Sequence, residues 1–276
     1  MAQAQPVGVQ ALAVALWWWA DFVYAPARAL KPLGLYRGET VGSPPEPDPW
    51  PGAGPRFSRE LDGPWLLDEE PGHYDSVAWF DEVSAEYDQL VMRFSGHIFA
   101  ETVARMRPHL GAAARILDPS AGPGRQAMDL AALVPDGEVV AADLSREMVL
   151  RAHADAQARG IRNMAFVQAD VSQPPAAFDE AFDAIFCCLA FHHYPDGRGA
   201  VEAFARVLAP GGVAFVADAG PAWMVALARD ISVAGDPGFV RHRTGHEFVD
   251  LFRDAGFRHV SWEEILPGMG LTTAVK

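Results

Sequence analysis

The sequence is poor in basic residues and has almost no cysteine. It contains 22 Lys and Arg against 36 Asp and Glu, which gives a formal net charge of −14. Because nucleic-acid binding rests on clustered Lys and Arg, we expect no nucleic-acid partner. The two cysteines, Cys187 and Cys188, are adjacent, and neighbours in a strand point to opposite faces. We therefore expect no structural disulfide and predict a cytoplasmic location.

The chain also lacks a long apolar run and a secretory leader. It has no zinc-type Cys/His spacing either, and we therefore expect no metal site. The opening MAQAQP carries no positive side chain, unlike a leader peptide. Residues 7–20 are apolar apart from Gln10, but this run is shorter than the roughly 20 residues that a bilayer crossing needs. It contains Trp17–Trp19, and tryptophans favour the membrane interface. Three interpretations stay open: a packed helix, a weak contact with the membrane interface, and a transmembrane span.

Two regions differ in composition. Residues 42–71 are dense in Pro, Gly and acidic residues, which predicts an irregular linker. We therefore divide the chain into an extension over residues 1–74, a helix followed by this linker, and a domain over residues 75–276. The extension is expected to serve as a lid or as a contact with a partner or a membrane. A homodimer is a further expectation for the whole chain.

From residue 75 onward the pattern predicts helices and strands in alternation. Repeated strand–helix units imply a parallel α/β sheet with helices on both faces. The last two strands are joined by a short link with Pro267 and Gly268, which suits a reversed hairpin. We predict seven strands, over residues 115–118, 138–143, 164–168, 184–189, 213–217, 257–264 and 271–275. The predicted helices span residues 77–90, 98–110, 126–133, 146–159, 199–208 and 246–255.

Three acidic residues stand where these strands end. Asp118 and Asp143 end the first two strands, and Asp170 follows the third. The carboxyl ends of parallel strands open onto the binding crevice of a doubly wound sheet. A carboxylate after the second strand can accept hydrogen bonds from both hydroxyls of a ribose. The glycine turn after Asp118 lacks the third glycine of a pyrophosphate-binding fingerprint, because Met128 stands near that place.

The chain resembles the class I S-adenosylmethionine-dependent methyltransferases, in particular the quinone-biosynthesis (UbiE-like) and related small-molecule enzymes. The resemblance covers about residues 77–276 and rests on motifs in the family's order. These are EVSAEYDQL, ILDPSAGPG, VVAADLSREM, QADVSQPP, FDAIFCCLAFHHYPD, RVLAPGGV and the closing GFRHVSWEEILPGMGLTTAVK. Ser120 stands where the family usually has its first glycine. The resemblance implies a Rossmann-like, doubly wound sheet that binds S-adenosyl-L-methionine and releases S-adenosyl-L-homocysteine.

The resemblance also implies roles for single residues. Asp143 would hold the ribose, with Leu144 and Met148 flanking the adenine. Asp170 would reach the adenine amino group, and Tyr87 would cover the methionine end of the cofactor. The full set implied to contact the cofactor is Tyr87, Asp118, Ser120, Ala121, Gly122, Gly124, Asp143, Leu144, Met148, Asp170, Val171, Cys187 and Cys188.

Methyl transfer is an in-line displacement, and it needs a base only if the acceptor arrives protonated. His192 and His193 follow the fourth predicted strand, and we favour His193 as this base, with Tyr194 and Asp218 as weaker candidates. The alternative is that one histidine caps a helix and the other is structural. An acceptor pocket is expected around Trp223, Met224 and Tyr194. Such a pocket suits a quinol, a phenol or a polyketide-like molecule, methylated on oxygen or carbon.

Three competing functions remain open from the sequence. The same cofactor platform can carry a cyclase or an aminopropyl transferase. A catalytically silent subunit that binds the cofactor and recruits a partner is the second alternative. A nicotinamide-dependent dehydrogenase is the weakest of the three, given the missing glycine and the reversed hairpin.

Overall fold

The computed structural model describes residues 20–48, 52–68, 95–220 and 238–276. Several predictions fall outside these residues: the helices over residues 7–20 and 77–90, with Trp17–Trp19 and Tyr87, and the pocket residues Trp223 and Met224. They stay predictions.

The centre of the molecule is one sheet of eight strands in the order β1-β7-β8-β6-β5-β2-β3-β4. The strands are β1 (Thr40–Val41), β2 (Arg115–Asp118), β3 (Glu138–Asp143), β4 (Met164–Gln168), β5 (Phe182–Cys188), β6 (Leu208–Ala219), β7 (Arg258–Leu266) and β8 (Met269–Val275). The five strands β2 to β6 pair in parallel, whereas β8 is antiparallel to both β6 and β7. The doubly wound sheet and its reversed C-terminal hairpin are therefore confirmed.

The prediction of seven strands was wrong by one. Thr40 and Val41 pair antiparallel with Glu263 and Trp262, so the extension adds β1 as an edge strand. A two-residue strand carries no period that a sequence pattern can show, and its partner lies more than 200 residues away. The predicted extension is thus in part a structural component of the sheet.

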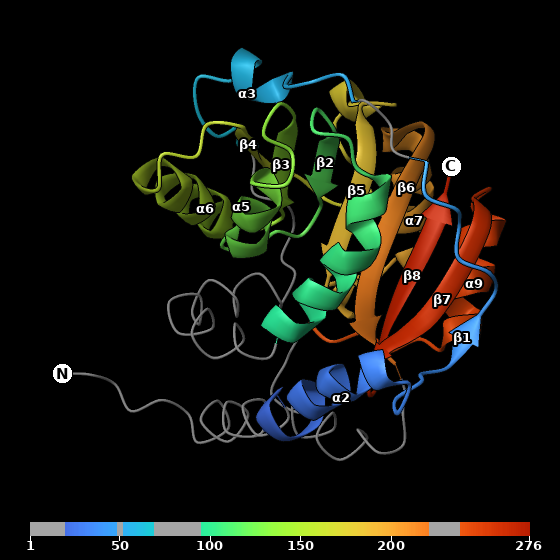
Figure 1. Ribbon diagram of the computed structural model, residues 1–276. Coiled ribbons are helices and arrows are strands. Elements are labelled where there is room, and N and C mark those ends of the chain that lie inside the picture. Colours follow the sequence, from blue (N-terminus) through green and yellow to red (C-terminus); the bar gives the residue numbers. More distant parts are fainter. Residues whose placement is uncertain (1–19, 49–51, 69–94, 221–237) are drawn as a thin grey trace.

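Helices cover both faces of the sheet (Figure 1). The helix of residues 95–106, α5 and α6 pack on one face around Ile98, Met128 and Val149. On the other face, α7 and α9 pack around Phe204 and Phe248. The named helices of the described residues are α2 (Ala25–Leu30), α3 (Phe57–Glu60), α5 (Arg125–Ala131), α6 (Arg146–Ala158), α7 (Gly197–Val207) and α9 (Gly245–Asp254).

The order of the strands creates a crevice at their carboxyl ends. The chain runs outward from β2 through β3 to β4, then returns to the other side of β2 with β5 and continues to β6. Neighbouring strands β2 and β5 therefore lead into connections on opposite faces, and ligands of such sheets bind at this switch point. The predicted site residues after β2, β3, β4 and β5 all lie along this edge of the sheet.

The extension lies against both edges of the sheet. Besides β1 at one edge, Trp65 forms a parallel bridge with Val167 of β4 at the other. The carboxylate of Glu138, which is fully buried, accepts hydrogen bonds from the backbone N–H groups of Arg56, Phe57 and Ser58. These contacts fix residues 52–68 to the side of the domain, and they protect edges that could otherwise pair with other chains.

The segment around α2 lies beneath the carboxyl ends of the strands (Figure 1). Glu101, on the helix of residues 95–106, anchors this segment through salt bridges with Arg28 (3.1 Å) and Lys31 (2.9 Å). Arg105 of the same helix forms a further salt bridge with Glu101 at 2.7 Å. Burial alone raises the pKa of Glu101, but the hydrogen bonds and charges of Lys31 and Arg105 outweigh it and lower that pKa. The extension is therefore attached at the end of the sheet where the crevice opens.

Among the helices of the described residues, none is long and apolar enough to cross a membrane. The transmembrane interpretation of residues 7–20 concerns a segment outside those residues.

Candidate active site

A glycine turn connects β2 to α5 and forms the floor of the crevice. The N–H of Ala121 donates to the carbonyl of Ala142 at 2.9 Å, which ties the turn to the end of β3. Gly124 has φ +75, and a Cβ there would lie 2.7 Å from the Cβ of Ala152 in α6. Both the left-handed backbone and the close approach of α6 require glycine at this position.

Asp143 holds the glycine turn in place. Its Oδ2 accepts a hydrogen bond from the N–H of Gly122 at 2.8 Å, and its Oδ1 accepts one from the N–H of Ser145 at 2.9 Å. Ser145 in turn caps α6, because its Oγ accepts from the N–H of Met148 at 3.1 Å. A carboxylate has about four acceptor sites, so Asp143 can accept further hydrogen bonds from a ribose.

Asp118 is buried at the end of β2, with 3% of its surface exposed. Burial raises its pKa well above the usual range, and the nearby Asp143 adds to this effect. The N–H of Ser120, 3.4 Å from Oδ1, opposes it only in part. Burial and the neighbouring Asp143 thus both favour the neutral form of this carboxyl group.

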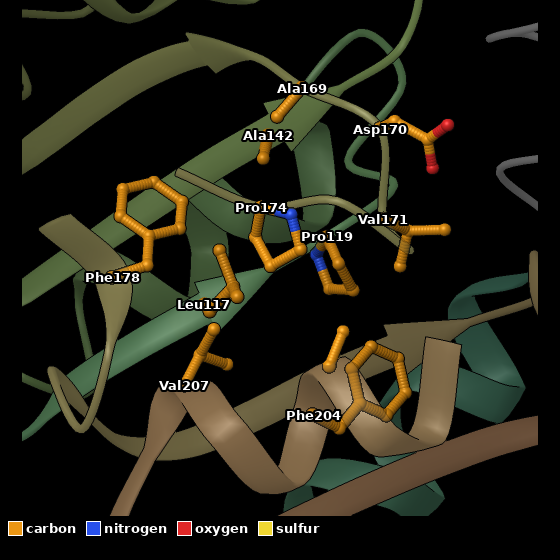
Figure 2. Close-up of a pocket in the computed structure, with 11 residues that line it drawn as sticks. Leu117, Pro119, Ala142, Ala169, Asp170, Val171, Pro174, Phe178, Phe204 and Val207 are labelled. Carbon is orange, nitrogen blue, oxygen red and sulfur yellow. The ribbon is translucent and has the colours of Figure 1, made fainter. Parts of the chain in front are cut away.

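Asp170 lies beside a small apolar pocket between the sheet and α7. Figure 2 shows Leu117, Phe178 and Phe204 turned toward this pocket, while the carboxylate of Asp170 points away from it. The N–H and the hydroxyl of Ser172 both donate to Oδ1 of Asp170, at 2.8 and 2.7 Å. The carboxylate is thus oriented at the rim, where a polar ligand group can meet it.

Ser120 connects the glycine turn to the segment after β5. Its Oγ lies 2.7 Å from the hydroxyl of Tyr194, and that hydroxyl lies 3.4 Å from the Sγ of Cys187. Tyr194 is buried, so this hydrogen bond forms where water cannot replace it easily. The hydroxyl group of Ser120, at the position where glycine was expected, therefore links the glycine turn to Tyr194. Burial raises the pKa of both Cys187 and Cys188, which favours the neutral thiol over the thiolate.

His192 forms a pair with Asp218. The Nδ1 of His192 lies 2.6 Å from the Oδ1 of Asp218, which is at the end of β6 and 2% exposed. Burial alone raises the pKa of Asp218, but the charge and hydrogen bond of His192 outweigh it, so this pKa lies below its usual range. His193 is the immediate neighbour, with its ring 4.1 Å from that of His192. The geometry thus favours His192 rather than His193 as a group that exchanges protons.

The structure brings most of the predicted site residues to one edge and adds others. Hydrogen bonds join Ser120, Tyr194 and Cys187 in one group and Gly122 and Asp143 in another, and both groups include residues of the glycine turn. Leu144 lies after β3 and its carbonyl accepts from Gln168, whereas Met148 is buried and Val171 lines the apolar pocket. Reasoning from the sequence missed His242, whose ring lies 5.5 Å from that of His192. No motif surrounds His242, so only the folded chain reveals this proximity.

We expect Ser120→Gly to weaken the link between the glycine turn and the segment that carries His192. Loss of a buried hydrogen bond that leaves Tyr194 without this partner destabilises a protein by about 1–3 kcal/mol. The free energy of unfolding, measured by urea denaturation, should fall by that amount. The double variant Tyr194→Phe/Ser120→Gly should lose no more free energy of unfolding than Ser120→Gly alone, because both partners of the hydrogen bond are then removed. Additive losses would show that the two hydroxyls do not interact.

Comparison with known proteins gives a consistent result. Residues 116–212 match the model of a methyltransferase domain. The chain is 35% identical over 135 residues to demethylmenaquinone methyltransferase of Thermus thermophilus, which covers 48% of this chain and 60% of that protein. It is 29% identical over 205 residues to 27-O-demethylrifamycin SV methyltransferase of Amycolatopsis mediterranei, covering 72% of each. The match thus spans less than two thirds of the Thermus protein's length.

A solved structure shows the same fold. The S-adenosylmethionine-dependent methyltransferase of Aquifex aeolicus superposes with a TM-score of 0.52 and covers 71% of this chain and 96% of that one. The two are 21% identical, so this likeness concerns the fold alone.

Proposed function

Since the chain belongs to the class I S-adenosylmethionine-dependent methyltransferases, we propose that it transfers a methyl group to a small apolar or aromatic acceptor. A quinol, a phenol or a polyketide-like molecule, methylated on oxygen or carbon, fits this class. The observation that carries the proposal is the His192–Asp218 pair on the same crevice as the glycine turn that Asp143 holds. The relatives that act on demethylmenaquinone and on a rifamycin support an acceptor of this kind.

The residues on the crevice suit the proposed cofactor. It supplies an activated methyl group on a cationic sulfonium, and it has no phosphate. Asp143 offers acceptor positions for the ribose hydroxyls, and the oriented carboxylate of Asp170 suits the adenine amino group. Asp118 lies beside them as a buried acid with a raised pKa, and nearby positive charge would stabilise its ionised form. The chain's contribution to rate is then mainly positioning, which can lower a barrier by several kcal/mol.

His192 is the proposed proton acceptor. With Nδ1–H donating to Asp218, the imidazole presents Nε2 as the basic nitrogen, so the hydrogen bond selects the tautomer. A phenol or an enolisable carbon gives its proton to this nitrogen as the methyl group is transferred. Asp218 stabilises the imidazolium that results, because its carboxylate is buried and ionised. The pair therefore stabilises the protonated form of His192.

The decisive experiment supplies methyl-labelled S-adenosylmethionine to the full chain together with a cell extract, and identifies the labelled product. We expect label in an apolar aromatic molecule and a matching amount of S-adenosylhomocysteine. Cofactor binding without transfer would favour the silent subunit. Conversion of the cofactor without transfer of its methyl group would favour a cyclase or an aminopropyl transferase.

A weak contact with a membrane interface is a further part of the proposal. Phe22, Leu33 and Leu35 are 63%, 70% and 70% exposed beside the crevice, and they follow Trp17–Trp19 in the sequence. Exposed apolar side chains of this kind favour insertion at the level of the lipid headgroups. The contact would place the crevice near a lipid-soluble acceptor such as a quinol.

We expect the full chain to float with phosphatidylethanolamine/phosphatidylglycerol vesicles. Leu33→Gln combined with Leu35→Gln should lower the vesicle partition coefficient about 100-fold or more, since each substitution loses about 1.5–3 kcal/mol of apolar burial. Leu150→Gln, at another exposed leucine in α6, serves as the matched control. If the wild-type chain never floats with these vesicles, the membrane contact does not exist.

A further inference from the structure

We propose that His192, Asp218 and His242 form a binding site for one divalent transition-metal ion, represented by Zn²⁺. Each residue offers one ligand atom, and these atoms all lie within 4.8 Å of one another. They come from three separate parts of the fold: the turn Phe191–His193, the end of β6 and the segment before α9. The inference shares two residues with the proposed base, but it depends neither on methyl transfer nor on the cofactor.

The spacing of the three ligand atoms is close to that of a metal site. Zinc binds imidazole nitrogen and carboxylate oxygen at about 2.0–2.2 Å, so two ligands of one tetrahedral ion lie roughly 3.4 Å apart. The Nδ1 of His192 and the Oδ1 of Asp218 are 2.6 Å apart around a shared proton. Replacement of that proton by a metal requires these two atoms to separate by less than about 1 Å. Side-chain rotation is sufficient for such a shift.

The set of donors selects the kind of ion. Two imidazoles and one carboxylate suit zinc, iron or nickel, whereas calcium and magnesium require mostly oxygen ligands. Three protein ligands leave a further position for water or another oxygen, as in catalytic rather than structural zinc sites. The buried, ionised carboxylate of Asp218 supplies a negative charge in a medium that screens it little.

Backbone hydrogen bonds hold the segment that carries His242, the third ligand, near His192 and Asp218. The N–H groups of Val240 and Arg241 both donate to the carbonyl of His192, at 2.9 and 3.3 Å. The ring of Phe239 packs 4.8 Å from that of His242. Asp218 is fixed as well, because its Oδ1 accepts from the N–H of Ala219 at 2.7 Å. The arrangement is therefore largely formed before an ion binds, which reduces the entropy lost on binding.

One neighbour opposes a cation. The guanidinium of Arg243 packs over the ring of Phe191 at 4.9 Å, and its charge interacts with that of Asp218. This positive charge limits the affinity, and the buried ring nitrogens of His242 mean that an ion must displace neighbouring side chains to reach the site. A metal also competes with the proton for His192, so binding should weaken as the pH falls, and an occupied site removes the proposed base.

The test uses the full chain, stripped of metal with a chelator and titrated with Zn²⁺ by calorimetry. We expect one ion per chain, and Co²⁺ at the same site should give the visible absorption of a nitrogen- and oxygen-ligated ion. His242→Gln and Asp218→Asn should each weaken Zn²⁺ binding at least tenfold, since loss of a ligand exceeds the 10–100-fold effect of outer-shell changes. His246→Gln, an exposed histidine in α9, is the matched control and should bind as the wild type does.

The results separate this inference from the proposed function. His242 is not part of the proposed base, so His242→Gln should still bind S-adenosylmethionine, which also shows that the variant is folded. Sub-stoichiometric Zn²⁺ binding, or equal binding by His242→Gln and the wild type, would overturn the metal site. Failure of the wild-type chain to bind S-adenosylmethionine would overturn the proposed function and leave the zinc result intact.

Discussion

Replacement of Asp143 by alanine is expected to abolish S-adenosylmethionine binding. The carboxylate is the proposed acceptor for the ribose hydroxyls, and hydrogen bonds to a charged group contribute about 1.5–3 kcal/mol each. Loss of two such bonds lowers the affinity about 100-fold or more. The same substitution removes the acceptor of the Gly122 N–H, so the glycine turn also loses the group that holds it. Calorimetric titration of the variant with the cofactor measures the effect.

The control for this prediction is Asp129→Ala, which removes an exposed carboxylate from α5. It should bind the cofactor as the wild type does. A thermal unfolding curve for Asp143→Ala should remain cooperative, because the β-sheet core does not include this side chain. Unchanged affinity in a folded Asp143→Ala would rule out the assigned place of the cofactor.

The strands that border the crevice were the easiest part of the fold to predict. The bounds of β2, β3 and β4 agree with the expectation residue for residue, because each is a short apolar run that ends at an acid or a polar residue. The later strands β5 and β6 begin earlier than expected, and β6 also extends further. The first residues of β6 include Pro210, Gly211 and Gly212, which a local pattern assigns to a turn. The register of β6 against β5 shifts between Leu208 and Val213, and Gly211 has φ +84, so these residues form an irregular start of the strand and keep part of that local preference.

The site was predictable where one segment carries a motif and not where separate segments meet. The acids after β2, β3 and β4 follow from topology alone. The choice between His192 and His193 does not, because neighbours in a short 3₁₀ turn point in different directions and only the position of Asp218 distinguishes them. The same reason explains why the partner of Ser120 was missed: Tyr194 follows β5, Ser120 follows β2, and only the pairing of these two strands brings them together.

The second large effect is expected for His192→Gln, which should lower kcat with an acidic acceptor about 100-fold or more while the affinity for the cofactor stays unchanged. A positioned general base contributes about 10²–10⁴ in rate. Asp218→Asn should act through His192: it should lower kcat by a smaller factor and leave KM for the cofactor unaltered, since Asp218 orients the imidazole. The measurement is single-turnover methyl transfer to a model phenol across a range of pH.

The pH profile distinguishes a base from a structural histidine. Without His192 the acceptor must lose its proton to solvent, so the rate of His192→Gln should rise with pH toward the ionisation of a phenol, near pKa 10. His193→Gln provides the comparison, and its loss should be at least tenfold smaller. Equal losses in the two variants, with parallel pH profiles, would mean that the pair with Asp218 stabilises the fold rather than accepting a proton. In that case the His192–Asp218 hydrogen bond would stabilise the turn after β5, and its loss would appear in the free energy of unfolding instead of in kcat.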